Sequence, residues 1–197
     1  MTQHDIQMDV GLHDESLKSL RRGLVLCEQI LQQNPDDAGI EGLRGLLLTH
    51  EGHNHAARQQ FEKALEAFTA ARAIMESQIQ SSPGQPQLLS RLSSVWQSIA
   101  FMKRQQLDRE GAETAWGKSI DLQQRAAHLS PEVASLHSQL AAQYRWRAAS
   151  RRDFGDLDGA LSDLRHVREL HSGDTYKFFL TAAIRASFVF WIDRQEW

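Results

Sequence analysis

Residues 112–159 read AETAWGKSIDLQQRAAHLSPEVASLHSQLAAQYRWRAASRRDFGDLDG, and they repeat the preceding 48 residues without a gap. Laid over residues 64–111, this stretch gives 11 identities in 48 positions. The identical pairs are Ala64/Ala112, Ala67/Ala115, Ser82/Ser130, Pro83/Pro131, Leu88/Leu136, Ser90/Ser138, Leu92/Leu140, Ala100/Ala148, Arg104/Arg152, Asp108/Asp156 and Gly111/Gly159. A fixed period of this length predicts a solenoid, in which each repeat packs only on its neighbours.

Helical periodicity runs through the chain. Apolar residues recur at spacings of three and four, and no segment alternates like a strand over more than a few residues. The expected helices cover about 14–34, 40–54, 56–81, 88–110, 112–129, 133–154 and 157–170, and one more covers 176–192. Residues 1–13 are expected to form a disordered tail, and residues 14–197 a helical repeat domain. The predicted fold class is all-α.

The second helix of each unit carries a small residue, a bulky apolar residue four positions later, and a further residue three positions after that. The instances are Ala64, Phe68 and Ala71; Ala112, Trp116 and Ser119; and Ala160, Leu164 and Val167. This pattern resembles the tetratricopeptide (TPR) repeat, in which small residues let paired helices approach closely. The resemblance implies a right-handed solenoid of antiparallel hairpins with about eight helices. Its units lie near 16–63, 64–111, 112–159 and 160–197.

The first helices fit the same resemblance, with a bulky residue followed four positions later by a small one. These pairs are Leu48/Gly52, Trp96/Ala100 and Tyr144/Ala148. The period of 48 exceeds the usual TPR period of about 34 residues, because each second helix continues to Pro83 or Pro131. Such long-helix repeats resemble arrays attached to some bacterial kinases and are similar to the repeats of kinesin light chains. The implied role is a protein–protein interaction scaffold, and the alternative is a regulatory or sensor domain of a larger protein such as a bacterial kinase.

Composition narrows the class of function. The net charge is −3, so no global field draws the chain to nucleic acid or to an anionic membrane. The single cysteine, Cys27, lies among apolar residues and is expected to be buried; with a start that lacks a secretory signal, it favours a cytoplasmic protein. Neither Gly-x4-Gly-Lys-Ser/Thr nor Gly-x-Gly-x-x-Gly occurs. We therefore expect no enzyme activity and no cofactor.

The resemblance also implies where a partner binds, because TPR first helices line the concave groove. The groove positions expected here are Thr49, His53, Gln97, Phe101, Arg104, Arg145 and Arg152. The arginines favour a protein or peptide with acidic residues, since arginine–carboxylate hydrogen bonds are the strong ones. The alternative is that these arginines only solvate a helix face. Trp96 and Trp116 fall on packing positions, whereas the role of Trp146 stays open.

Three histidines, His50, His53 and His55, invite a metal interpretation because imidazole nitrogens are common zinc ligands. The spacing falls one residue short of His-Glu-x-x-His, whose histidines lie at i and i+4. The cluster is also expected at the end of a helix and in the turn after it, where it would be a solvated polar turn. We predict no metal site here; a metal-dependent hydrolase would require one.

The stretch Tyr176–Ile192 is apolar at 13 of its 17 positions. A membrane span needs about 20 apolar residues, and this run is shorter and carries Arg185 in its middle. A helix that is apolar nearly all round has to be covered on more than one side. We expect a second copy in a homodimer, or a continuation of the chain, to cover a set of large side chains. This set is Phe178, Phe179, Phe188, Phe190 and Trp191.

Overall fold

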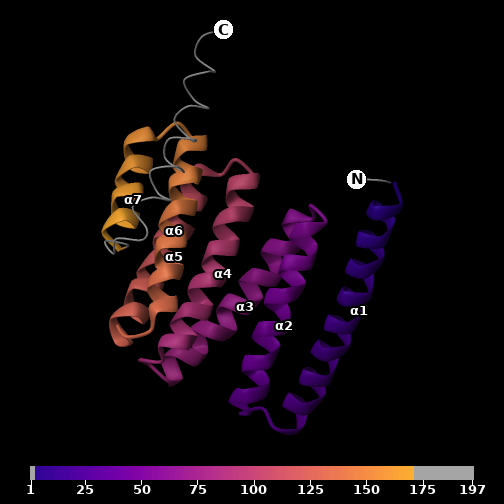
Figure 1. Cartoon of the computed structure of the whole chain (residues 1–197). Helices are drawn as coiled ribbons and strands as arrows, with labels where there is room; N and C mark the ends of the chain where they lie inside the picture. The colour runs from indigo at the N-terminus through magenta and orange to yellow at the C-terminus, as the bar shows by residue number, and fades with distance from the viewer. Residues whose placement is uncertain (1–2, 171–197) are drawn as a thin grey trace. The chain divides into compact units, whose positions relative to one another are not determined.

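The computed structural model describes residues 3–170, with side chains from residue 14 onward. These residues form seven helices and no strand, which confirms the all-α fold. The helices are α1 (Gln3–Gln33), α2 (Ala38–Ala57), α3 (Phe61–Ser81), α4 (Pro86–Gln105), α5 (Arg109–Leu129), α6 (Ala134–Asp153) and α7 (Leu157–Leu170) (Figure 1). The helix expected over 176–192 lies outside the described residues. No helix of the described part combines the length and apolar character needed to cross a membrane.

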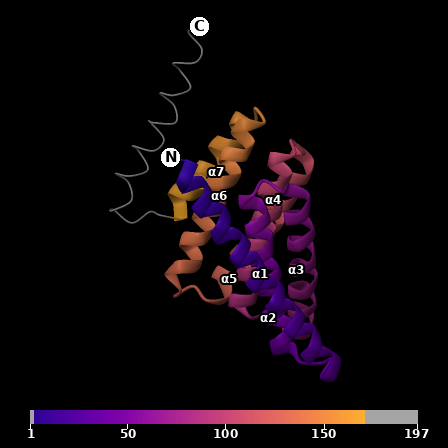
Figure 2. The same cartoon turned by 90° about the vertical axis from the view of Figure 1, so that its right-hand side faces the viewer.

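The helix starts follow the repeat. α2, α4 and α6 begin at residues 38, 86 and 134, and α3, α5 and α7 begin at 61, 109 and 157, so each start recurs after 48 residues. The chain divides into two compact units, Met1–Leu136 and His137–Trp197, which are described separately below. In the first unit α1 packs on α2, and the hairpins α2–α3 and α4–α5 pack on each other through α3 and α4 (Figures 1 and 2).

Several boundaries differ from the sequence-based expectation. The helix expected over 88–110 ends at Gln105. α1 begins at Gln3, so residues 3–13, expected as a disordered tail, continue the helix backwards from residue 14. α2 continues to Ala57 and α3 begins only at Phe61, whereas the pattern predicted a break after residue 54. Glycine is a poor helix former, so Gly52 suggested a helix end. Inside α2 it is favoured by packing, because a side chain there would collide with Phe68 of α3.

Aspartate side chains cap the N-termini of several of these helices. Asp37 Oδ1 accepts hydrogen bonds at 3.0 Å from the backbone N–H groups of Gly39 and Ile40. Asp108 Oδ1 accepts one from Gly111 at 2.8 Å, and one repeat later Asp156 does the same with Gly159 at 2.9 Å. Such caps satisfy backbone donors that have no partner inside the helix. Their recurrence explains the repeated Asp-x-x-Gly, because a Cβ on either glycine would collide with the capping carboxylate.

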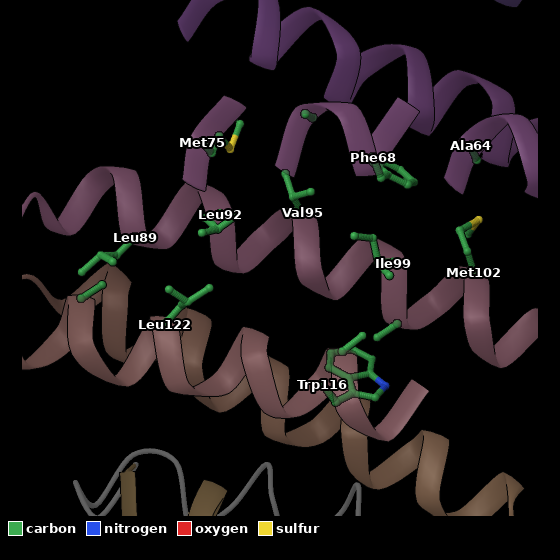
Figure 3. Packing of buried hydrophobic residues seen from close by; sticks show 14 of the residues in the cluster. Ala64, Phe68, Met75, Leu89, Leu92, Val95, Ile99, Met102, Trp116 and Leu122 are labelled. Atoms are coloured by element: carbon green, nitrogen blue, oxygen red, sulfur yellow. The ribbon is translucent and has the colours of Figure 1, made fainter. Parts of the chain in front are cut away.

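The core of the first unit lies on both sides of α4. Leu92, Val95 and Ile99 of α4 lie between Phe68 of α3 and Trp116 of α5 (Figure 3). Phe68 and Trp116 have no exposed surface, which confirms that Trp116 is a packing residue. Burial of such large apolar side chains is the dominant favourable term in folding.

The small residues of the signature lie where helices approach closely. Ala64, Ala71 and Ala100 have no exposed surface. At Gly52 of α2, an added Cβ would lie 2.6 Å from Cε1 of Phe68, closer than any side chain tolerates. The α2–α3 hairpin therefore needs a glycine at this position, as the TPR-like pattern predicts. Cys27 of α1, 2% exposed, is buried as expected.

Candidate partner-binding surfaces

In the compact unit of residues 1–136, α2 of one hairpin meets α4 of the next through a polar contact. His53 of α2 lies 3.0 Å (Nε2–Oγ) from Ser98 of α4, and its ring also contacts Phe68 edge-on at 5.1 Å between centroids. Thr49 lies one turn before His53, and its hydroxyl donates to the carbonyl of Gly45 at 2.9 Å. The contact joins α2 and α4 into one surface.

The predicted groove residues of α4 lie along one side of that helix. Gln97, Phe101 and Arg104 follow at spacings of four and three, and all three side chains are partly buried. Phe101 is only partly accessible, because its ring packs edge-on against Trp116 with 5.1 Å between centroids. We refer to the predicted groove residues Thr49, His53, Gln97, Phe101 and Arg104 as the α2–α4 face.

The other two predicted groove residues belong to the second unit. Arg145 and Arg152 of α6 are both exposed. Arg152 hydrogen-bonds to the carboxylate of its neighbour Asp153, at 3.1 Å from Nε and 2.9 Å from Nη2. Exposed pairs of this kind contribute little to stability, so the guanidinium can exchange partners at low cost. Trp146, between them, is 46% exposed.

The remaining arginines of α6 form an ion-pair cluster that sequence reasoning missed. Arg147 donates to both carboxylate oxygens of Asp163 in α7, at 3.0 Å from Nε and 2.6 Å from Nη2. Arg151 Nη1 donates to the same carboxylate at 3.0 Å. Asp163 is 1% exposed, so both guanidinium groups compensate one buried charge. The available signal was the spacing of four between the arginines, which places both on one side of α6.

A stacked pair adjoins this cluster. Tyr144 of α6 and His166 of α7 stack with their planes 5° apart and centroids 4.9 Å apart. The guanidinium carbon of Arg147 lies 5.4 Å from the centroid of the Tyr144 ring. Burial raises the pKa of the Tyr144 phenol, an effect that the positive charge of Arg147 opposes. These contacts hold α6 and α7 together, and they assign Arg147 and Arg151 to structure rather than to binding.

The three histidines of α2 have different neighbours. His55 is buried, and its Nδ1 lies 2.7 Å from Gln60 Oε1. His50 and His53 are both exposed residues, but one face of the His53 ring is covered by its contacts with Ser98 and Phe68. Over the part of the chain with described side chains, no three His, Cys, Asp or Glu residues come close enough to hold a metal ion. Burial, and secondly the charge of His50, lower the pKa of His53. His53 therefore favours the neutral form in the folded chain.

Comparison with known proteins shows only distant similarity. No protein-family model and no curated protein matches the chain. Among solved structures, BtubC (BKLC) from P. vanneervenii is 13% identical with a TM-score of 0.49, over 80% of this chain and 56% of BtubC, so this chain spans little more than half of BtubC's length. TTC0263, a thermophilic TPR protein of Thermus thermophilus, is 18% identical with a TM-score of 0.42, over 92% of this chain and 96% of that one.

A designed protein is also similar. The de novo helical repeat protein DHR64 is 13% identical with a TM-score of 0.38, over 92% of this chain and 96% of its own. The large apolar side chains predicted to be covered by a second copy or by a continuation of the chain lie outside the described residues. They are Phe178, Phe179, Phe188, Phe190 and Trp191.

Proposed function

We propose that the chain is a protein-interaction module whose binding surface in the first unit is the α2–α4 face. The contact between His53 and Ser98 carries this proposal, because it brings the first helices of successive hairpins side by side. Repeat proteins use extended surfaces of this kind to bind partners. The partner is a protein or peptide of the same compartment, which we propose to be the cytoplasm.

The partner carries acidic residues. Arg104 of the α2–α4 face and, in the second unit, Arg145 and Arg152 each offer a planar guanidinium that can bind a carboxylate through two hydrogen bonds. Gln97 and Phe101 contact neighbouring residues of the partner and fix its register. A second proposal keeps the same surface but makes the partner a neighbouring domain of a larger polypeptide, such as a bacterial kinase.

Affinity capture with charge-reversed variants tests the proposal. The chain of 197 residues is used as bait in lysate of its source cells, and bound proteins are identified by mass spectrometry. One variant carries Gln97→Glu and Arg104→Glu, and a second carries Arg145→Glu and Arg152→Glu. A control carries Arg109→Glu and Lys118→Glu at two exposed positions of α5.

The site variants should lower the recovery of acidic partners at least about fivefold, since repulsion replaces a charge-assisted hydrogen bond. The control should recover the same partners as the unchanged chain. Equal recovery by all three variants would contradict this assignment of the binding surface. Circular dichroism checks that each variant keeps its helical content.

A further inference from the structure

A groove of about 800 Å³ lies in the first unit between α1, the end of α2 and the start of α3. Its rim carries five cationic side chains: Lys18, Arg21, Arg22, Arg58 and Lys63. Its wall on α1 includes three apolar side chains: Leu17, Val25 and Leu26. We name this feature the basic groove. It is separate from the α2–α4 face, because the two share no residue.

The positive charge of the basic groove is poorly compensated. Among its lining residues with described side chains, Asp14 is the one carboxylate, and it pairs with Arg58 at 2.7 Å. Arg21 lies 3.6 Å from Glu51, with a side chain that is 61% exposed, so this pair is weak. Within residues 14–170, Lys18, Arg22 and Lys63 form no ion pair. Like charges at this density attract an anionic ligand.

Packing of the repeat does not require these cations. One repeat later, the equivalents of the five are uncharged or acidic: Glu66, Thr69, Ala70, Gln106 and Gly111. The matching groove between α3 and α5, of about 570 Å³, is lined by two cations and two carboxylates. Both cations are engaged there: Lys103 pairs with Asp108 at 3.0 Å, and Arg72 lies over the ring of Trp96 at 5.0 Å. The charge excess is therefore particular to the first groove.

The basic groove also exposes apolar surface. Val25 is 51% exposed and Leu26 is 58% exposed. Ile74, the equivalent of Leu26 one repeat later, is 7% exposed because it packs near Gly45 of α2. In the described part of the chain no helix covers Leu26 in this way. Adjacent apolar and charged surface of this kind is typical of an interaction site.

We propose that the basic groove binds an acidic amphipathic helix of a partner protein. Its apolar side covers Val25 and Leu26, and its carboxylates pair with Lys18, Arg22 and Lys63. On α1, Arg22 follows Lys18 by four residues, and Val25 and Leu26 follow Arg22 by three and four. These side chains form one stripe that a second helix can follow. The apolar wall favours a peptide over nucleic acid, whose backbone would leave that wall uncovered.

Fluorescence anisotropy tests the proposal on the full chain. The probe is a labelled helical peptide of about 18 residues with Leu at every third and fourth position and Glu beside them. A matched peptide carries Lys in place of each Glu. One protein variant combines Lys18→Glu with Arg22→Glu, a second combines Val25→Ser with Leu26→Ser, and the control again carries Arg109→Glu and Lys118→Glu. The apolar variant keeps all groove charges, and thermal melting confirms that each variant folds.

The acidic probe should bind, the Lys-containing peptide should not, and affinity should fall when salt rises from about 50 to about 300 mM. Each groove variant should weaken binding at least about tenfold, whereas the control should change it less than about twofold. No loss in folded groove variants would overturn the site. Equal binding of a single-stranded oligonucleotide would overturn the peptide assignment, and tighter binding of a synthetic peptide of residues 171–197 would replace the partner with a second copy of this chain. Variants of Gln97 and Arg104 should leave this binding unchanged, so the outcome is independent of the α2–α4 face.

Discussion

Arg147 of α6 binds the carboxylate of Asp163 in α7 through two hydrogen bonds of 3.0 and 2.6 Å. Arg151 adds a third at 3.0 Å, and Asp163 itself is 1% exposed. A buried charge with this compensation fixes how two helices meet, while its removal leaves two cations facing each other. Arg147 and Arg151 therefore stabilise the contact between α6 and α7 in the second unit and are not assigned to partner binding.

Replacement of Asp163 should destabilise the second unit. Asp163→Ala should lower the free energy of unfolding by about 3 kcal/mol, because two partly buried guanidinium groups lose their counter-charge. Urea denaturation followed by circular dichroism measures this change. Glu169→Ala, at an exposed position of the same helix, should change it by less than about 0.5 kcal/mol. Equal effects of the two replacements would show that the ion-pair cluster is dispensable.

The two helical glycines Gly52 and Gly117 should respond to alanine in opposite directions. At Gly52 a Cβ would meet the buried ring of Phe68 at 2.6 Å, whereas at Gly117 nothing lies within 4 Å. Gly52→Ala should cost about 1–2 kcal/mol through overpacking, and Gly117→Ala should stabilise by up to about 1 kcal/mol through helix propensity. Thermal melts of both variants check the signs. Stabilisation by Gly52→Ala would refute the close approach of α2 and α3.

The turns before α5 and α7 offer an exchange of residues. Leu107 has φ 59° and Gly155 has φ 80°, at positions one repeat apart. A left-handed conformation costs a non-glycine residue about 1–2 kcal/mol, and Leu107, 81% exposed, packs little. Leu107→Gly should therefore stabilise the chain by about 0.5 kcal/mol after the greater freedom of the unfolded glycine is allowed for. Gly155→Leu should destabilise it by about 1 kcal/mol. The same sign for both replacements would contradict the shared turn geometry.

The lowered pKa of His53 predicts a pH dependence of stability. Because the folded pKa lies below the ordinary value of 6.5, the unfolded chain binds the extra proton first. The contribution of His53 is therefore complete above that value and is lost as pH falls below it. NMR titration should give His53 an apparent pKa below 6.5, and His50→Gln should raise it by removing a neighbouring positive charge. An unshifted pKa in the folded chain would contradict the partial desolvation of this imidazole beside Ser98 and Phe68.

Much of the fold is predictable from the sequence, because its determinants are local and repeated. The periodicity of three and four, Pro131 and the recurring Asp-x-x-Gly predict the helices from α5 onward closely, and Pro83 predicts the end of α3. The same reasoning ended α2 too early, since Gly52 suggests a helix end unless its contact with Phe68 is known. That contact joins residues 16 positions apart and depends on tertiary packing.

The candidate sites were less predictable. Sequence spacing placed Gln97, Phe101 and Arg104 on one side of a helix, but it could not show that Phe101 turns towards Trp116. The roles of Arg147 and Arg151 depend on Asp163, which lies on the next helix. The basic groove could not be predicted because its cations come from α1, from the turn after α2 and from α3, and no single stretch of sequence contains them.

Hydrogen–deuterium exchange on the full chain with and without a captured partner tests the central claim most directly. If the α2–α4 face is the binding surface, partner binding should slow exchange in peptides of α2 and α4 (residues 38–57 and 86–105). Arg104→Glu should reduce that protection, and circular dichroism should show that the variant keeps its helical content. Protection confined to α3 and α5, with none on α2 or α4, would contradict the account.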